Sequence, residues 1–133
     1  MSKKILPYVD LIFFDIKIAN PDTHLRLTGK SNRKIISNLK RLIKEGDVVV
    51  HPRIPFIPEI TSTRENLSYI IQILIDSGAG IVTLLPYNPM GFELCYKIGK
   101  SIPKLPLSFM TFQEEKKIHS LVKSLVKESM CMP

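Results

Sequence analysis

Two opposite charges close an apolar run near the start of this 133-residue chain, in the segment LIFFDIKIANP over residues 11–21. Asp15 and Lys17 stand two positions apart. Side chains alternate along a strand, so positions i and i+2 point to one face, about 6.6 Å apart along the strand axis. A carboxylate and an ammonium placed in this way can form an ion pair or can bind a zwitterionic or anionic small ligand.

Polar residues also follow the next two apolar runs. Arg53 comes after VVVHP, and Tyr87 and Asn88 come after VTLLP. Parallel α/β folds gather their sites at the carboxyl ends of the strands, so these residues are expected on neighbouring loops. Two interpretations remain open: an ion pair of Asp15 with Lys17 or with Arg53 that closes this end of the fold, or a ligand site.

The elements that must position these residues alternate along the chain. Nearly continuous apolar or β-branched runs predict strands, and apolar residues at helical spacing predict helices. The predicted strands cover residues 9–16, 47–58 and 80–87, and the predicted helices cover 33–46, 64–78 and 112–128. Residues 19–32 and 88–109 are predicted loops, the second with room for a helical turn.

Prolines and helix caps refine these elements. Prolines at 52, 55 and 58 predict that the second strand leaves regular pairing at its far end. Ser31 or Asn32 can cap the first helix, and Thr111 with Glu114 forms a capping box for the last. The alternation predicts an α/β fold with about three parallel strands, helices on the outer face, and one domain over residues 1–133.

Composition narrows the possible functions. The formal net charge is +7, but the basic residues are scattered over helix faces, so a nucleic-acid function is not favoured. No apolar run reaches the ~18 residues of a membrane span, and the start lacks a secretory signal, so a cytoplasmic location is expected. Cys95 and Cys131 lie far apart with no histidine at ligand spacing, which indicates two free thiols and no metal site.

Four segments, in this order, resemble one family. They are DLIFFDIK (10–17), HLRLTGKSN (24–32), HPRIPFIPEITST (51–63) and LLPYNPMG (84–91). Together they resemble the C-terminal half of the glycyl-radical-enzyme activating enzymes, in the radical S-adenosylmethionine superfamily, over about residues 5–127. The resemblance implies that the chain is the C-terminal half of a partial (β/α) barrel.

The resemblance also implies roles for particular residues. Asp15, Ile16 and Lys17 match the segment that contacts the methionyl part of S-adenosylmethionine, whose ammonium suits Asp15 and whose carboxylate suits Lys17. Arg53 matches an arginine near the ribose or the carboxylate. Asn88 stands where many relatives carry a histidine against the adenine, so it can hydrogen-bond but cannot stack.

The largest departure from the family is the missing CxxxCxxC loop, which holds a [4Fe–4S] cluster and lies upstream of these segments. The resemblance therefore implies a fragment that is inert alone and that pairs with an N-terminal half or with itself, while the complete enzyme acts on a glycyl-radical enzyme. Its first strand would form a sheet edge, so the isolated chain is expected to be dimeric, to aggregate or to be partly disordered in about its first 20 residues. The alternative is a non-catalytic α/β binding module with a basic surface.

The chain by itself is expected to carry no iron–sulfur cluster and to leave S-adenosylmethionine uncleaved, because cluster binding needs clustered cysteine thiolates. Anaerobic reconstitution with iron and sulfide, followed by visible absorption and by assay of 5′-deoxyadenosine, checks this. A stable cluster with turnover would contradict it.

Overall fold

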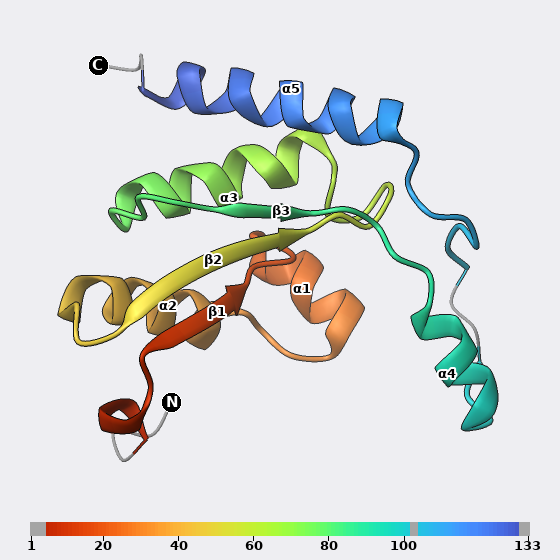
Figure 1. Cartoon of the computed structure of the whole chain (residues 1–133), viewed down its shortest axis with the longest axis horizontal. Helices are drawn as coiled ribbons and strands as arrows, with labels where there is room; N and C mark the ends of the chain where they lie inside the picture. Colours follow the sequence, from red (N-terminus) through yellow and green to blue (C-terminus); the bar gives the residue numbers. More distant parts are fainter. Residues whose placement is uncertain (1–4, 102–103, 131–133) are drawn as a thin grey trace.

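The computed structural model describes residues 5–101 and 104–130 and shows three strands with helices between them. In chain order the elements are η1 (Leu6–Tyr8), β1 (Leu11–Asp15), α1 (Pro21–Thr28), α2 (Arg33–Glu45), β2 (Val49–Pro55), α3 (Arg64–Asp76), β3 (Thr83–Leu85), α4 (Gly91–Lys97) and α5 (Phe112–Met130). Figure 1 shows β1, β2 and β3 side by side, with α5 lying along α3. Cys131 and the first four residues lie outside the described residues.

The three strands form one parallel sheet in the order β1-β2-β3, as the alternation predicted. Leu11 lies opposite Val49 and Asp15 lies opposite Arg53, so β1 pairs with β2 along its whole length. The third strand is short and pairs with β2 only over Thr83–Leu85. All three carboxyl ends therefore lie at one edge of the sheet.

The prediction of a loop over residues 19–32 is wrong, because this segment contains helix α1. The Asn20 side chain accepts hydrogen bonds from the backbone N–H groups of Asp22 and Thr23, and Pro21 occupies the first turn. Gly29 ends the helix in the left-handed conformation. Asn-Pro-Asp and Gly are turn residues, but Asn20 and Gly29 start and stop a helix when eight residues lie between them.

Two prolines lie inside the central strand, whose far end leaves regular pairing before residue 58, as they predicted. β2 runs to Pro55, and Pro52 lies opposite Phe14 in β1. The carbonyl of Arg53 accepts from the Ile16 N–H and therefore faces β1, so Pro52 faces the β3 side, where pairing begins only with the next residue. Pro52 thus removes no hydrogen bond from the ladder, which explains why a proline is tolerated here.

The capping box of α5 is confirmed. The backbone N–H and the hydroxyl of Thr111 both donate to Glu114, at 2.8 and 2.7 Å, and the Glu114 N–H donates to the Thr111 hydroxyl at 3.3 Å. These bonds lower the pKa of Glu114. The capping box therefore stabilises the folded chain above the ordinary pKa of a glutamate. This stabilisation is lost as the pH falls through the lowered pKa of Glu114. α5 then packs on α3 through Val122 and Leu125, both buried.

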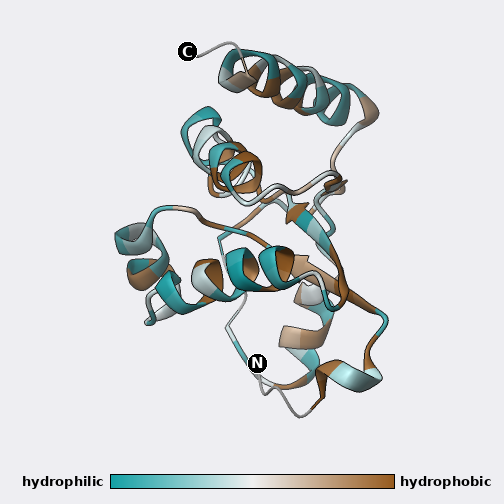
Figure 2. Cartoon of the chain, turned by 90° about the vertical axis from the view of Figure 1, so that its left-hand side faces the viewer, coloured by the Kyte–Doolittle hydropathy of each residue, from teal (hydrophilic) through white to brown (hydrophobic). Residues whose placement is uncertain are grey.

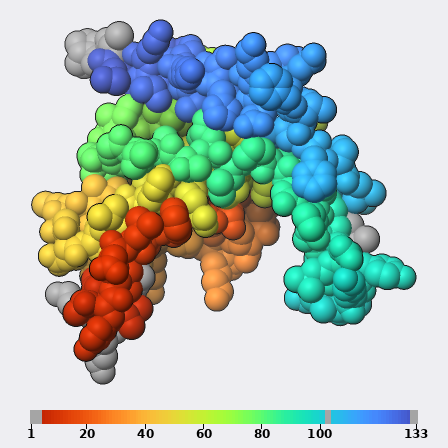
Figure 3. Space-filling view, viewed as in Figure 1, coloured from red at the N-terminus to blue at the C-terminus, as the bar shows by residue number. Residues whose placement is uncertain are grey.

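The helices cover only one face of the sheet. On this covered face Ile12, Ile16 and Ile54 are buried, and the core continues into α2, α3 and α5. The opposite face, called the open face below, carries the side chains of Leu11, Phe13, Asp15, Val49, His51, Arg53, Thr83 and Leu85. Phe13 is 55 % exposed and Val49 65 % exposed. The space-filling view of Figure 3 shows residues of the three strands at the surface, and Figure 2 shows hydrophobic residues, in brown, along strands as well as helices.

The exposed apolar side chains of the open face predict self-association at micromolar concentration, because monomeric proteins rarely leave such a patch in water. Val49→Lys should shift the chain toward monomer. Tyr69→Lys, on the exposed side of α3, is the matched control and should leave the association unchanged. Size-exclusion chromatography with light scattering measures both, and a wild-type chain that stays monomeric across concentrations contradicts the prediction.

Candidate ligand site at the carboxyl edge of the sheet

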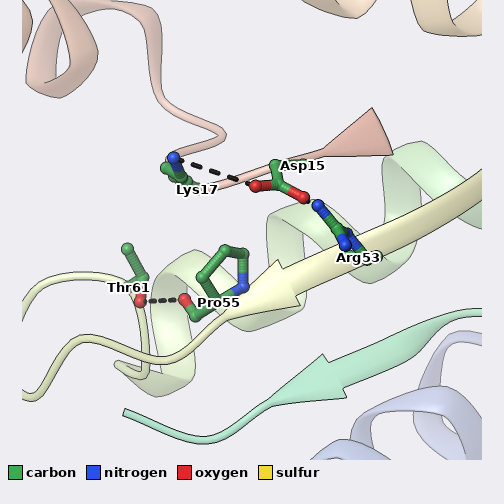
Figure 4. Close-up of polar contacts among 5 residues, drawn as sticks. All are labelled: Asp15, Lys17, Arg53, Pro55 and Thr61. Carbon is green, nitrogen blue, oxygen red and sulfur yellow. Dashed lines mark hydrogen bonds and ion pairs between the residues drawn. The ribbon is translucent and has the colours of Figure 1, made fainter. Parts of the chain in front are cut away.

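Asp15, Lys17 and Arg53 meet where β1 and β2 end. The Arg53 Nε atom donates to Asp15 Oδ1 at 2.8 Å, and Lys17 Nζ lies 3.9 Å from Asp15 Oδ2 (Figure 4). Asp15 and Arg53 are about one-third exposed, and Lys17 is more than half exposed. The sequence interpretation of an ion pair is confirmed for Asp15 with Arg53, and the Lys17 contact is longer and looser.

This ion pair leaves binding capacity for a ligand. Among the described residues, the two terminal nitrogens of the Arg53 guanidinium have no hydrogen-bond partner. The Lys17 ammonium touches Asp15 only at the outer limit of an ion pair. A fork of two donors and a mobile ammonium suit an anionic group, while Asp15 can accept from a cationic one. The edge can therefore bind a small ligand that carries both charges.

Three further residues of the open face surround Arg53, and the sequence analysis missed them. The Arg53 guanidinium lies 4.8 Å from the centre of the Phe13 ring, and that ring lies 5.6 Å from the His51 ring. His51 Nε2 lies 2.7 Å from the Thr83 hydroxyl oxygen. The two-residue alternation from Asp15 back to Phe13, and from Arg53 back to His51, was the signal that could have identified the two rings.

The other predicted site residues lie differently. Ile16 is 2 % exposed and its side chain belongs to the core, so a ligand could meet only its backbone. Asn88 is exposed after β3, two strands away from Asp15, and its side-chain oxygen accepts from the Met90 N–H at 2.9 Å. Tyr87 is buried and donates its hydroxyl to the Pro106 carbonyl at 2.8 Å. The structure thus brings together Asp15, Lys17 and Arg53, with Asn88 on a separate loop.

Thr61 anchors the backbone that follows Arg53. It is fully buried, and its hydroxyl donates to the Pro55 carbonyl and accepts from the Ile57 N–H, both at 2.6 Å (Figure 4). One side chain therefore supplies two partners to a turn that the prolines leave short of regular pairing. This bond pair fixes the end of β2 two residues beyond Arg53.

The described residues offer no metal centre. Among residues 5–101 and 104–130, no group of three or more histidine, cysteine or carboxylate side chains could hold a metal ion. Cys95 lies on α4 as a free thiol. In that same part of the chain, no helix has the length and apolar character needed to cross a membrane.

Lys17→Ala should lower the free energy of unfolding by less than about 1 kcal/mol, because an exposed, loosely paired lysine stabilises little. Thr61→Val should lower it by about 1–3 kcal/mol, because it leaves a partly buried carbonyl and a partly buried N–H without their partner. Urea denaturation of both variants measures the difference. A larger loss for Lys17→Ala, in the range of about 3–5 kcal/mol, would mean that Lys17 is part of a structural buried pair.

The sequence of the chain is similar to those of several characterised proteins. No family model matches the chain. The chain is 34 % identical over 100 residues to the trans-4-hydroxy-L-proline dehydratase activating enzyme of Clostridioides difficile, covering 74 % of the chain and 33 % of the relative. It is 35 % identical over 104 residues to the pyruvate formate-lyase 2-activating enzyme of Escherichia coli, covering 75 % and 35 %. The pyruvate formate-lyase-activating enzyme of Clostridium pasteurianum is 28 % identical over 94 % of the chain and 52 % of its own length.

The fold has a solved counterpart. A domain of a pyruvate-formate lyase-activating enzyme from Bacteroides vulgatus superposes with a TM-score of 0.66 over 93 % of this chain and 70 % of that one, at 18 % identity. The chain spans about a third of the length of most of the curated relatives that it matches, and about half of one. Sequence and fold together make this chain a relative of the glycyl-radical-enzyme activating enzymes over that part of their length.

Proposed function

We propose that the chain forms one wall of an S-adenosylmethionine site in an activating enzyme for a glycyl-radical enzyme. Asp15 accepts from the ammonium of the methionyl group, and Lys17 pairs with its carboxylate. Arg53 orients the carboxylate or the ribose through its terminal nitrogens. Ile16 contributes through its backbone, and Asn88 hydrogen-bonds from the loop after β3.

The single observation that carries this proposal is that Asp15, Lys17 and Arg53 meet, each partly exposed, at the carboxyl edge. Asp15 has a cation on either side, at 2.8 and 3.9 Å, and each of the three groups stays open to solvent. An ion pair that served only stability would need no second cation, and an exposed ion pair adds little to the free energy of unfolding. The donor set also matches the ligand, because the methionyl group presents one cationic and one anionic end next to each other.

The [4Fe–4S] cluster of the family does not fit the residues of this chain. The sequence holds only Cys95 and Cys131, thirty-six positions apart, whereas such clusters are held by several closely spaced thiolates. The chain's own residues bind and orient the ligand, and cleavage of the ligand needs a CxxxCxxC segment from elsewhere. The radical chemistry and its target protein therefore belong to the complete activating enzyme.

The open face supports a second part of the proposal. Its exposed apolar residues and its aromatic pair lie below the ligand edge, on the face without helices. In a closed (β/α) barrel this face points inward and meets the strands on the other side. We propose that further barrel strands cover it in the working enzyme, which would enclose the ligand and exclude water from it.

Binding of S-adenosylmethionine to the chain, measured by isothermal titration calorimetry, tests the proposed function. Lys17→Ala should weaken the affinity by about tenfold, the equivalent of one charge-assisted hydrogen bond. Lys127→Ala removes another exposed ammonium, on α5, and should leave the affinity unchanged. Equal affinities of the wild type and the Lys17→Ala variant, or no binding by the wild type, would contradict the proposed function.

A further inference from the structure

Two buried asparagines hold the short segment that carries Lys17. Asn66, on α3, donates to the Lys17 carbonyl at 2.9 Å and accepts from the Ala19 N–H at 2.9 Å. Asn32 donates to the carbonyls of Ile18 and Ala19, both at 2.8 Å. Every carbonyl from Lys17 to Ala19 therefore accepts from an asparagine side chain, just beyond the end of β1.

Neither asparagine side chain makes a hydrogen bond that stabilises its own helix. Asn32 is the N-cap of α2, yet its side chain makes no capping hydrogen bond. Asn66 is the third residue of α3, inside a helix where asparagine is a poor helix former. Both are buried, at 2 % and 8 % exposed. Each side chain instead bonds to the backbone of residues 17–19, which is distant in sequence.

The third bond of Asn66 links this segment to the rest of the edge. Its side-chain nitrogen also donates to the Thr61 carbonyl at 2.9 Å, and Thr61 in turn fixes the end of β2 through Pro55. Asn66 therefore touches the backbone that follows both Asp15 and Arg53. The bond to the Lys17 carbonyl holds the peptide plane that contains the Lys17 Cα, which restrains the direction in which the Lys17 side chain leaves the backbone, and the bond to the Ala19 N–H holds the next peptide plane.

We propose that Asn66 is a positioning residue for the ligand site, which holds Lys17 toward Asp15 through hydrogen bonds to the backbone of residues 17–19. The proposal rests on the proposed function, because it assigns Lys17 to the ligand. Asn32 supports the same segment from α2. Asn66 itself touches no ligand, since its polar atoms are all used within the chain.

A double-mutant cycle on the whole chain tests this role. Asn66→Ala should weaken binding of S-adenosylmethionine by about tenfold, as Lys17→Ala does. The double variant should bind no more weakly than Lys17→Ala alone, because residues that act through one another are not additive. Val122→Ala, a core truncation on α5, is the control for lost stability and should bind as the wild type does.

Amide hydrogen exchange without ligand supplies the second measurement. The Ala19 N–H should exchange at least about tenfold faster in Asn66→Ala, while its rate in Val122→Ala should stay near the wild-type value. Asn66→Ser serves if the alanine variant does not fold. Failure of both Asn66 variants to fold, at a temperature where Val122→Ala is folded, would assign Asn66 to stability alone and overturn the proposal.

The outcomes separate the two proposals. Wild-type affinity in Asn66→Ala despite faster exchange at Ala19, or effects of the two substitutions that add fully, would reject the positioning role and leave the proposed function standing. Wild-type affinity in Lys17→Ala would reject the proposed function, and with it the role assigned to Asn66.

Discussion

The ion pair between Asp15 and Arg53 depends on the register of two parallel strands. Because the two residues lie opposite each other, their side chains leave the sheet on the same face and meet at 2.8 Å. A slip of one residue would send one of them into the core, where a lone charge is costly. The buried isoleucines on the covered face, which hold that register, thus also decide whether the edge has a site at all.

Much of this arrangement follows from sequence periodicity. The apolar run before Asp15 and the β-branched run before Arg53 predicted adjacent parallel strands, and the polar residues after them predicted a shared edge. Thr111 with Glu114 predicted the start of α5 correctly. These features depend on residues close together in sequence, which is why local patterns were sufficient.

Other features depend on contacts that local patterns do not encode. Asn-Pro-Asp and Gly29 indicate a turn or a helix equally well, and only the eight-residue spacing between the caps favours α1. Ser31 or Asn32 was expected to cap α2. Asn32 stands at the N-cap, but its side chain bonds to Ile18 and Ala19, fourteen and thirteen positions earlier. The prolines predicted that β2 leaves regular pairing at its far end, but only the pairing shows why Pro52 fits inside the strand: its nitrogen faces β3, where pairing begins at Arg53. Each depends on where a distant segment comes to lie.

Parallel pairing also has a consequence for how the chain folds as it leaves the ribosome. Asp15 and Arg53 are 38 positions apart, and His51 and Thr83 are 32 apart, so each strand contact closes a long loop. Such contacts form slowly, since the entropy of loop closure must be overcome first. β1 therefore leaves the ribosome before its partner β2, and it stays unpaired with β2 while α1 and α2 are synthesised. That interval is when a chaperone, or a partner strand made earlier, has the best access to it.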